Sequence, residues 1–132
     1  DDEKRIPVNL AIAQAIHESN WGKSRFAREA NNLYGIRTFD SSKDQLKPLD
    51  NPNVTWGLRI FETKCESVSY YMWLLNYSHH YSEFREERLM QYAGDVVNLD
   101  KLALTLAIYS EDVYYTQKII RTLKKLESYD RD

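Results

Sequence analysis

The stretch QAIHESNWGKSRFAREANN, residues 14–32, places a carboxylate, Glu18, in an apolar helical pattern and then breaks the pattern with Asn-Trp-Gly. Residues 8–19, VNLAIAQAIHES, are apolar on almost every side. Pro7 before them suits the first turn of a helix, because its missing N–H has no partner there. These residues predict a buried helix that ends just after Glu18.

The chain after this break predicts a short helix and a small lobe. Residues 23–30, KSRFAREA, predict a second helix with Ser24 as its N-cap. Residues 38–53 contain few large apolar side chains and are too long for an idle connector, so we expect an exposed binding loop. Residues 54–61, VTWGLRIF, have the composition of a strand, which predicts a small β-hairpin lobe.

The rest of the chain predicts helices. We expect them over residues 65–77, 83–93, 99–109 and 113–127. Thr63 and Glu66 have the spacing of a capping box, Ser82 can cap the next helix, and Gly94 can end it. The predicted fold is α+β and predominantly α, as a single domain over residues 1–132.

Composition adds few constraints. Lys and Arg total 18 and Asp and Glu total 20, so the formal charge of −2 gives no reason to expect a nucleic-acid partner. No apolar run reaches the roughly 20 residues that span a bilayer, and the first residues, DDEKRIP, show no export signal. Cys65 is the only cysteine, and we expect it to be a buried thiol. We also expect a monomer.

Glu18 suits a cleft better than a core. The residues three, four and seven positions before Glu18, which share its helix face, are Ala15, Gln14 and Ala11. Two of them are small, which leaves space beside the carboxyl group. The negative end of the helix dipole and partial burial should both raise its pKa, as general acid catalysis requires. The alternative is a solvated surface Glu.

Residues 17–37, HESNWGKSRFAREANNLYGIR, resemble the signature of bacterial peptidoglycan β-N-acetylglucosaminidases, glycoside hydrolase family 73. The residues that match the family pattern are Glu18, Ser19, Trp21, Gly22, Ser24, Arg25, Phe26, Ala27, Asn32, Leu33, Tyr34 and Gly35. Residues 59–85 and the stretch YSEDVYYTQKI, residues 109–119, are also similar to the family, and most of all to its Bax-type branch. The resemblance covers nearly the whole chain.

The resemblance implies a lysozyme-like helical fold with a small β-lobe, and hydrolysis of the β-1,4 bond after N-acetylglucosamine. Glu18 matches the family's catalytic acid, and Tyr109 matches its active-site tyrosine, which otherwise would be a core residue. The partner would be the glycan strands of peptidoglycan, located in the periplasm or outside the cell. The resemblance implies no cofactor.

A second carboxylate is harder to place. Two-carboxylate glycosidases separate their acids by roughly 5–5.5 Å for retention or roughly 6.5–9.5 Å for inversion. The candidates are Asp40, Asp44, Asp50 and Glu62, although each alone is more often a solvated loop acid. Glu111, beside Tyr109 in the C-terminal motif, is a further candidate for the cleft, whereas Asp112 can equally cap the last helix.

Three more residues are candidates for sugar contacts. Trp21 and Tyr34 offer rings to sugar faces, although Trp21 can instead pack the turn after the first helix. Asn32 can bind an acetamido group or satisfy the backbone of its turn. No metal site is expected, because neither a His-x-x-x-His nor a Cys pair accompanies the histidines His17, His79 and His80.

Two rival functions stay open. A lytic transglycosylase shares the architecture and needs one dominant acid, so the missing second carboxylate favours it. A catalytically silent wall-binding module would keep the cleft without turnover. Glu18 with Tyr109 argues against that alternative, whereas the unplaced second carboxylate argues for it.

Overall fold

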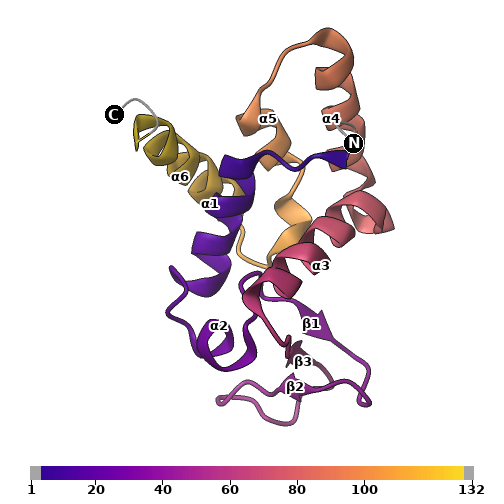
Figure 1. The fold of residues 1–132 in the computed structure, drawn as a ribbon, viewed down its shortest axis with the longest axis vertical. Coiled ribbons are helices and arrows are strands. Elements are labelled where there is room, and N and C mark those ends of the chain that lie inside the picture. The colour runs from indigo at the N-terminus through magenta and orange to yellow at the C-terminus, as the bar shows by residue number, and fades with distance from the viewer. Residues whose placement is uncertain (1–3, 130–132) are drawn as a thin grey trace. The chain divides into compact units, whose positions relative to one another are not determined.

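The computed structural model describes residues 4–129. Its α-helices are α1 (Val8–Ser19), α2 (Arg25–Ala30), α3 (Lys64–Tyr77), α4 (Ser82–Gly94), α5 (Leu99–Leu104) and α6 (Tyr115–Tyr129). Its strands are β1 (Arg37–Thr38), β2 (Gln45–Leu46) and β3 (Gly57–Arg59) (Figure 1). This confirms the predicted α+β class, predominantly α. The chain divides into two compact units, a middle unit of residues 15–71 and a terminal unit of residues 1–14 and 72–132.

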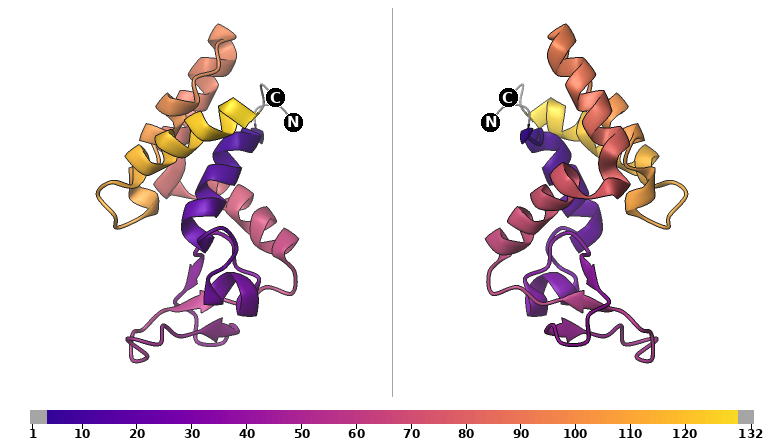
Figure 2. Two further views of the ribbon diagram at one scale, coloured as in Figure 1. Left: turned by 90° about the vertical axis from the view of Figure 1, so that its left-hand side faces the viewer. Right: turned by 90° about the vertical axis from the view of Figure 1, so that its right-hand side faces the viewer.

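The middle unit contains a small antiparallel sheet with the strand order β1-β3-β2. Leu58 of the central strand faces Arg37 on one side and Leu46 on the other. Helix α2 contacts β2 and β3, and both views in Figure 2 show it beside the strands. The lobe therefore has one strand more than the predicted hairpin, and its central strand is shorter than residues 54–61. The buried apolar side chains of this unit include Ala27, Ala30, Tyr34, Ile36, Leu58, Phe61 and Tyr71.

The terminal unit is helical, and α5 contacts both α4 and α6. Its buried apolar side chains include Leu10, Leu75, Phe84, Leu102, Leu106, Ile119 and Leu123. Burial of side chains from five helices, α1, α3, α4, α5 and α6, supplies the apolar core that none of these helices could form alone.

The local start signals are mostly confirmed. The Ser24 hydroxyl accepts a hydrogen bond from the Ala27 N–H at 3.2 Å and so caps α2. Before α3, the Thr63 hydroxyl accepts from the Glu66 N–H at 3.1 Å. The Glu66 carboxylate accepts from the Glu62 N–H at 3.1 Å, one residue earlier than in a standard capping box. These contacts fix the start of each helix through groups close in sequence.

The helix expected over residues 99–109 is interrupted. Helix α5 ends at Leu104, and a separate 3₁₀ helix covers Ala107–Tyr109. The Thr105 hydroxyl donates to the Leu102 carbonyl at 2.6 Å, a local bond that competes with the helical pattern. The Thr105 N–H also bonds to Leu102, three residues back, which tightens the last turn. The prediction of one continuous helix was therefore wrong.

Both predicted ends of the α4 segment are shifted by one residue or more. Ser82 is the first residue of α4 rather than its cap, because a 3₁₀ helix capped by Ser78 runs directly into it through Tyr81. Gly94 is the last helical residue, and Asp95 takes the left-handed conformation, with φ 54°. The left-handed position thus falls on an acid that tolerates it, not on the glycine.

Cys65 is exposed, so the expected buried thiol was wrong. It lies in the first turn of α3 with Lys64 and Glu66, which are exposed as well. None of the helices within residues 4–129 is long and apolar enough to cross a membrane. In the same part of the chain, no group of three or more His, Cys, Asp or Glu side chains is placed to hold a metal ion.

Candidate active site

Glu18 is half-buried in the last turn of α1, where three successive left-handed residues reverse the chain. Asn20, Trp21 and Gly22 have φ values of 50°, 61° and 76°. The Ser19 hydroxyl holds this turn, because it donates to the Ala15 carbonyl at 2.6 Å and accepts from the Gly22 N–H at 2.8 Å. A left-handed Trp is strained by about 1–3 kcal/mol, and such strain concentrates at functional sites.

The carboxylate of Glu18 lies against the backbone of Gly35. A Cβ added at Gly35 would stand 2.9 Å from Oε1 of Glu18, a separation that real Cβ atoms do not show. Gly35 also has φ 65°, which only glycine adopts at little cost. The positive φ favours glycine at this position, and any larger residue would displace the carboxyl end of Glu18.

Asn32 holds the turn that carries Gly35. Its side chain is buried, and its amide nitrogen donates to the carbonyls of Ile36 and Arg59, both at 2.9 Å. Its carbonyl oxygen accepts from the N–H groups of Tyr34 at 3.3 Å and Ile36 at 3.0 Å. All four hydrogen-bonding positions of the amide are used. The predicted contact with an acetamido group finds no support, and the turn-holding alternative describes Asn32 instead.

The two aromatic candidates differ sharply in exposure. Tyr34 is 3% exposed, and its ring stacks on Tyr71 with centroids 3.9 Å apart and planes at 10°. Burial raises the pKa of Tyr34 to about 12. Its ring is covered by the protein, so the structure gives it no open face for a sugar. Trp21, by contrast, is 62% exposed and does not pack its ring under the turn.

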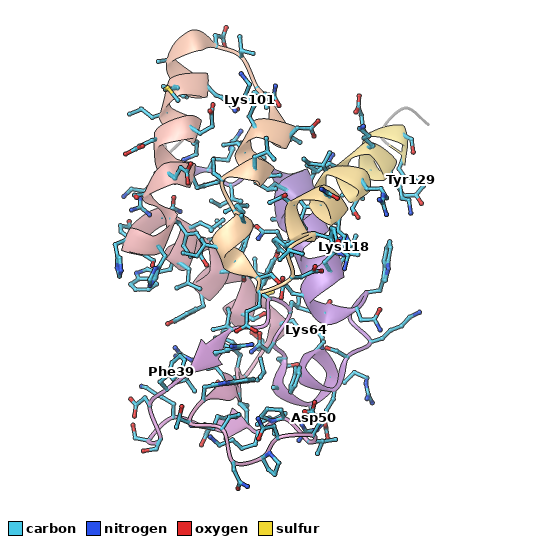
Figure 3. The ribbon with its side chains drawn as sticks, turned by 180° about the vertical axis from the view of Figure 1, so that it is seen from behind. Phe39, Asp50, Lys64, Lys101, Lys118 and Tyr129 are labelled. Atoms are coloured by element: carbon cyan, nitrogen blue, oxygen red, sulfur yellow. The ribbon has the colours of Figure 1, made fainter. Side chains whose placement is uncertain are left out.

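Glu18 is the only acid of residues 15–71, all of which the structure describes, that is not exposed. The exposed acids include every lobe candidate for a second carboxylate, namely Asp40, Asp44, Asp50 and Glu62. The Asp40 carboxylate accepts from the N–H and hydroxyl of Ser42, which lowers the pKa of Asp40. Asp50 lies on the loop between β2 and β3 (Figure 3). No lobe acid stands out as the partner of Glu18.

Tyr109 belongs to the terminal unit, where it is half-buried at the end of a 3₁₀ helix. Its ring is parallel to that of Tyr115, with centroids 6.0 Å apart, and is tilted against Tyr81 at 5.9 Å. The Tyr115 hydroxyl accepts from Nε2 of Gln14 at 3.0 Å, and both side chains are buried. The C-terminal motif thus pairs a half-exposed tyrosine with a buried one that anchors it.

The two acids beside Tyr109 take different places. Glu111 is exposed and lines a cavity of about 300 Å³ together with Ser110, Val113 and Tyr115. The Asp112 carboxylate accepts from the Tyr114 N–H at 2.9 Å and pairs with Lys118. Asp112 therefore stabilises the start of α6, as its alternative role predicted.

The structure gives tertiary contacts to three residues for which the sequence suggested none. Gly35 was only a motif match, and its contact with Glu18 depends on a fold that local patterns do not specify. Gln14 carried a signal, because it is a polar residue in an apolar helix, one turn before Glu18. Arg37 also went unnoticed, although its guanidinium carbon lies 3.9 Å from the ring centroid of Trp56.

His79 and His80 lie in the 3₁₀ helix before α4 with ring centroids 4.0 Å apart, and both are exposed. They connect α3 to α4, as expected of an adjacent pair in a helix-connecting loop.

The chain is similar to known glycoside hydrolases. The family model described as mannosyl-glycoprotein endo-beta-N-acetylglucosaminidase matches residues 1–128. The protein Bax of Escherichia coli K12 is 35% identical over 83 residues, which cover 63% of this chain and 28% of Bax. The exo-glucosaminidase LytG of Bacillus subtilis is 27% identical over 137 residues, which cover 98% of this chain and 48% of LytG. The chain thus spans less than half the length of these relatives.

A solved structure shares the fold. It is a C-terminally truncated glycoside hydrolase domain of FlgJ from Salmonella typhimurium, with a TM-score of 0.61 and 21% sequence identity. The match covers 93% of this chain and 85% of that domain. The likeness confirms the predicted fold of a mainly helical glycoside hydrolase domain.

Proposed function

The chain belongs to the glucosaminidase family of glycoside hydrolases, and from this premise we propose that it hydrolyses the β-1,4 bond after N-acetylglucosamine in bacterial peptidoglycan. The relative LytG is named as an exo-glucosaminidase, which supports the sugar assignment. The substrate would place the protein in the periplasm or outside the cell.

The observation that carries the proposal is the environment of Glu18. It is the one acid of the middle unit withdrawn from solvent, and its carboxylate lies against a glycine whose bare Cα leaves room for it. As general acid, Glu18 gives its proton to the glycosidic oxygen while the bond from C1 to that oxygen breaks. Water then adds to C1 and releases a proton to solvent, and Glu18 takes up a proton before the next turnover. A positioned acid of this kind contributes roughly 10²–10⁴-fold to the rate.

Two further residues have supporting roles in the proposal. The Tyr109 hydroxyl is a hydrogen-bond partner for the substrate or the attacking water, and Tyr115 fixes the orientation of its ring. The exposed ring of Trp21 provides a flat apolar face for a sugar. Trp21 follows Glu18 by three residues in the same unit, and its backbone has the strained left-handed conformation.

One observation favours a second candidate function. Because every other acid of residues 15–71 is exposed, the middle unit offers no obvious second carboxylate to activate water. A lytic transglycosylase avoids that need, since a sugar hydroxyl replaces water as the nucleophile. The two functions leave different products, a reducing N-acetylglucosamine end for the hydrolase and a 1,6-anhydro end for the transglycosylase.

The test is digestion of purified peptidoglycan, with the products identified by mass spectrometry. We expect reducing N-acetylglucosamine ends from the native chain and at least about a hundredfold slower release from Glu18→Gln. Release at the native rate by Glu18→Gln would remove the acid from its role. No release by either protein would favour a binding module without turnover.

A further inference from the structure

The terminal unit contains a cavity of about 520 Å³ away from the tyrosines described above. Its lining comes from the segment before α1, from α4, from the loop that leads to α5, and from α5 itself. The lining residues that matter here are Arg5, Arg88, Tyr92, Asp95, Val96 and Val97. Its volume falls in the range of roughly 300–1,000 Å³ that is typical of sites for small ligands.

Arg88 lines this cavity together with the charged residues Arg5 and Asp95. Its Nη1 donates to the Arg5 carbonyl at 3.2 Å, and its guanidinium carbon lies 5.4 Å from the ring centroid of Phe84. Burial, together with the nearby Arg85, lowers the pKa of Arg88. Among residues 4–129, no carboxylate forms an ion pair with it. A half-buried guanidinium without a carboxylate leaves several donors for an anionic ligand.

The wall beside this cation is apolar and open to water. Val96 is 63% exposed, Val97 is 78% exposed and Tyr92 is 57% exposed. An occupant would cover these side chains and remove apolar surface from water, which favours binding. Asp95 lies on the same lining, where its carboxylate can accept N–H groups. The complementary ligand therefore carries a carboxylate, small apolar groups and N–H donors.

We propose that this cavity binds a short peptide through a carboxylate held by Arg88. A peptide offers all three features at once, with methyl side chains for the valines and backbone N–H groups for Asp95. The inference rests on the proposed function, because the stem peptides of peptidoglycan carry free carboxylates and alanine methyl groups. The protein would then bind a stem peptide in its terminal unit as well as cleave the glycan strand.

Binding is tested with a synthetic stem tetrapeptide, L-alanyl-γ-D-glutamyl-L-lysyl-D-alanine, and with the same peptide amidated at every carboxylate. Titration is followed through the backbone amide signals of the ¹⁵N-labelled chain. We expect Kd below about 1 mM for the free peptide, with shifts at Gln91 and Val97. The amidated peptide should bind at least about tenfold more weakly, because it loses the charge-assisted hydrogen bonds.

Variants assign the effect to Arg88. Arg88→Ala should weaken the free peptide at least about tenfold, whereas Arg121→Ala, an exposed arginine of α6, should not change Kd. If thermal unfolding shows that Arg88→Ala is poorly folded, Arg88→Lys keeps the charge and stem but loses the planar fork, and should bind with an intermediate Kd. Equal Kd values for both peptides, or for Arg88→Ala and the native chain, would overturn the inference.

Absence of binding at millimolar free peptide would overturn it as well. The proposed function is scored separately, by cleavage of peptidoglycan glycan strands from which the stem peptides have been removed, with the native chain. Cleavage without peptide binding would reject the cavity and keep the glycosidase. Peptide binding without glycan cleavage would reject the glycosidase and leave the cavity as a peptide site.

Discussion

The carboxylate of Glu18 and the backbone of Gly35 lie so close that a Cβ at Gly35 would stand 2.9 Å from Oε1 of Glu18. The two residues come from different elements, one from the end of α1 and the other from the turn before β1. Their contact means that the conformation of the acid depends on a position seventeen residues further along the chain. Substitutions at glycine can therefore report on the acid without changing it.

Gly35→Ala should slow glycan cleavage about a hundredfold, because the new methyl group displaces the carboxylate from its place. Gly22→Ala is a matched control, since Gly22 has φ 76° but no atom within 4 Å of an added Cβ. Both variants should lose about 1–2 kcal/mol of unfolding free energy from the left-handed backbone. Cleavage rates measured beside urea unfolding separate the two effects. Equal activity losses in the two variants would contradict a specific contact with Glu18.

Asn32→Ala should lower the unfolding free energy by about 2–5 kcal/mol, because it leaves buried N–H and C=O groups of the turn without partners. The measurement is urea denaturation followed by circular dichroism. If the variant had native stability and a raised KM for glycan, this result would instead support the contact between Asn32 and an acetamido group that the sequence suggested.

Tyr34 should make stability depend on pH in the alkaline range. Its pKa is raised to about 12 by burial, while an unfolded tyrosine titrates near 10. Below pH 10 both states hold the proton, so Tyr34 adds no pH dependence. Between about pH 10 and 12 only the unfolded state releases it, and stability falls by on the order of 2–3 kcal/mol. The test is to measure the free energy of unfolding of the native chain and of Tyr34→Phe between about pH 10 and 12. If both free energies changed with pH in the same way, Tyr34 would not be the source of the pH dependence.

Trp21→Ala should weaken binding to chitin oligosaccharides about tenfold, a loss of roughly 1.4 kcal/mol, with little change in stability because most of the ring is exposed. Phe39→Ala is the control, since Phe39 is 71% exposed in the same unit, just after β1 (Figure 3). Calorimetric titration of both variants gives the comparison. Equal weakening in both would point to a nonspecific loss of apolar surface.

Local chemistry explains why part of the fold could be predicted from the sequence. The end of α1 and the cap of α2 depend on Ser19, Ser24 and their neighbours within five residues, so the pattern contains the information. The break after α5 depends on the hydrogen bond from the Thr105 hydroxyl to the Leu102 carbonyl. This threonine is visible in the sequence, but the apolar pattern around it favours a continuous helix. Helix propensity alone does not decide whether the helix continues or breaks at Thr105.

Glu18 and Tyr109 stay predictions for the candidate site, and the contacts around them could not be predicted from the sequence. Whether Tyr34 is buried depends on Tyr71, which is distant in sequence, and the same holds for Gly35 and Glu18. Asn32 satisfies groups on residues up to 27 positions away. Contacts of this range arise from tertiary packing, so residue type and spacing left the roles of Asn32 and Tyr34 open.

Tyr109→Phe and Tyr115→Phe should separate a catalytic hydroxyl from a structural one. Removing the Tyr115 hydroxyl leaves Nε2 of the buried Gln14 without its acceptor, so stability should fall by about 1–3 kcal/mol. Removing the Tyr109 hydroxyl should slow cleavage at least tenfold, since that group is proposed to bind substrate or water, whereas Tyr115→Phe should affect stability more than cleavage. Thermal unfolding and cleavage rates are measured on both. Native cleavage by Tyr109→Phe would reduce Tyr109 to a packing partner of Tyr115.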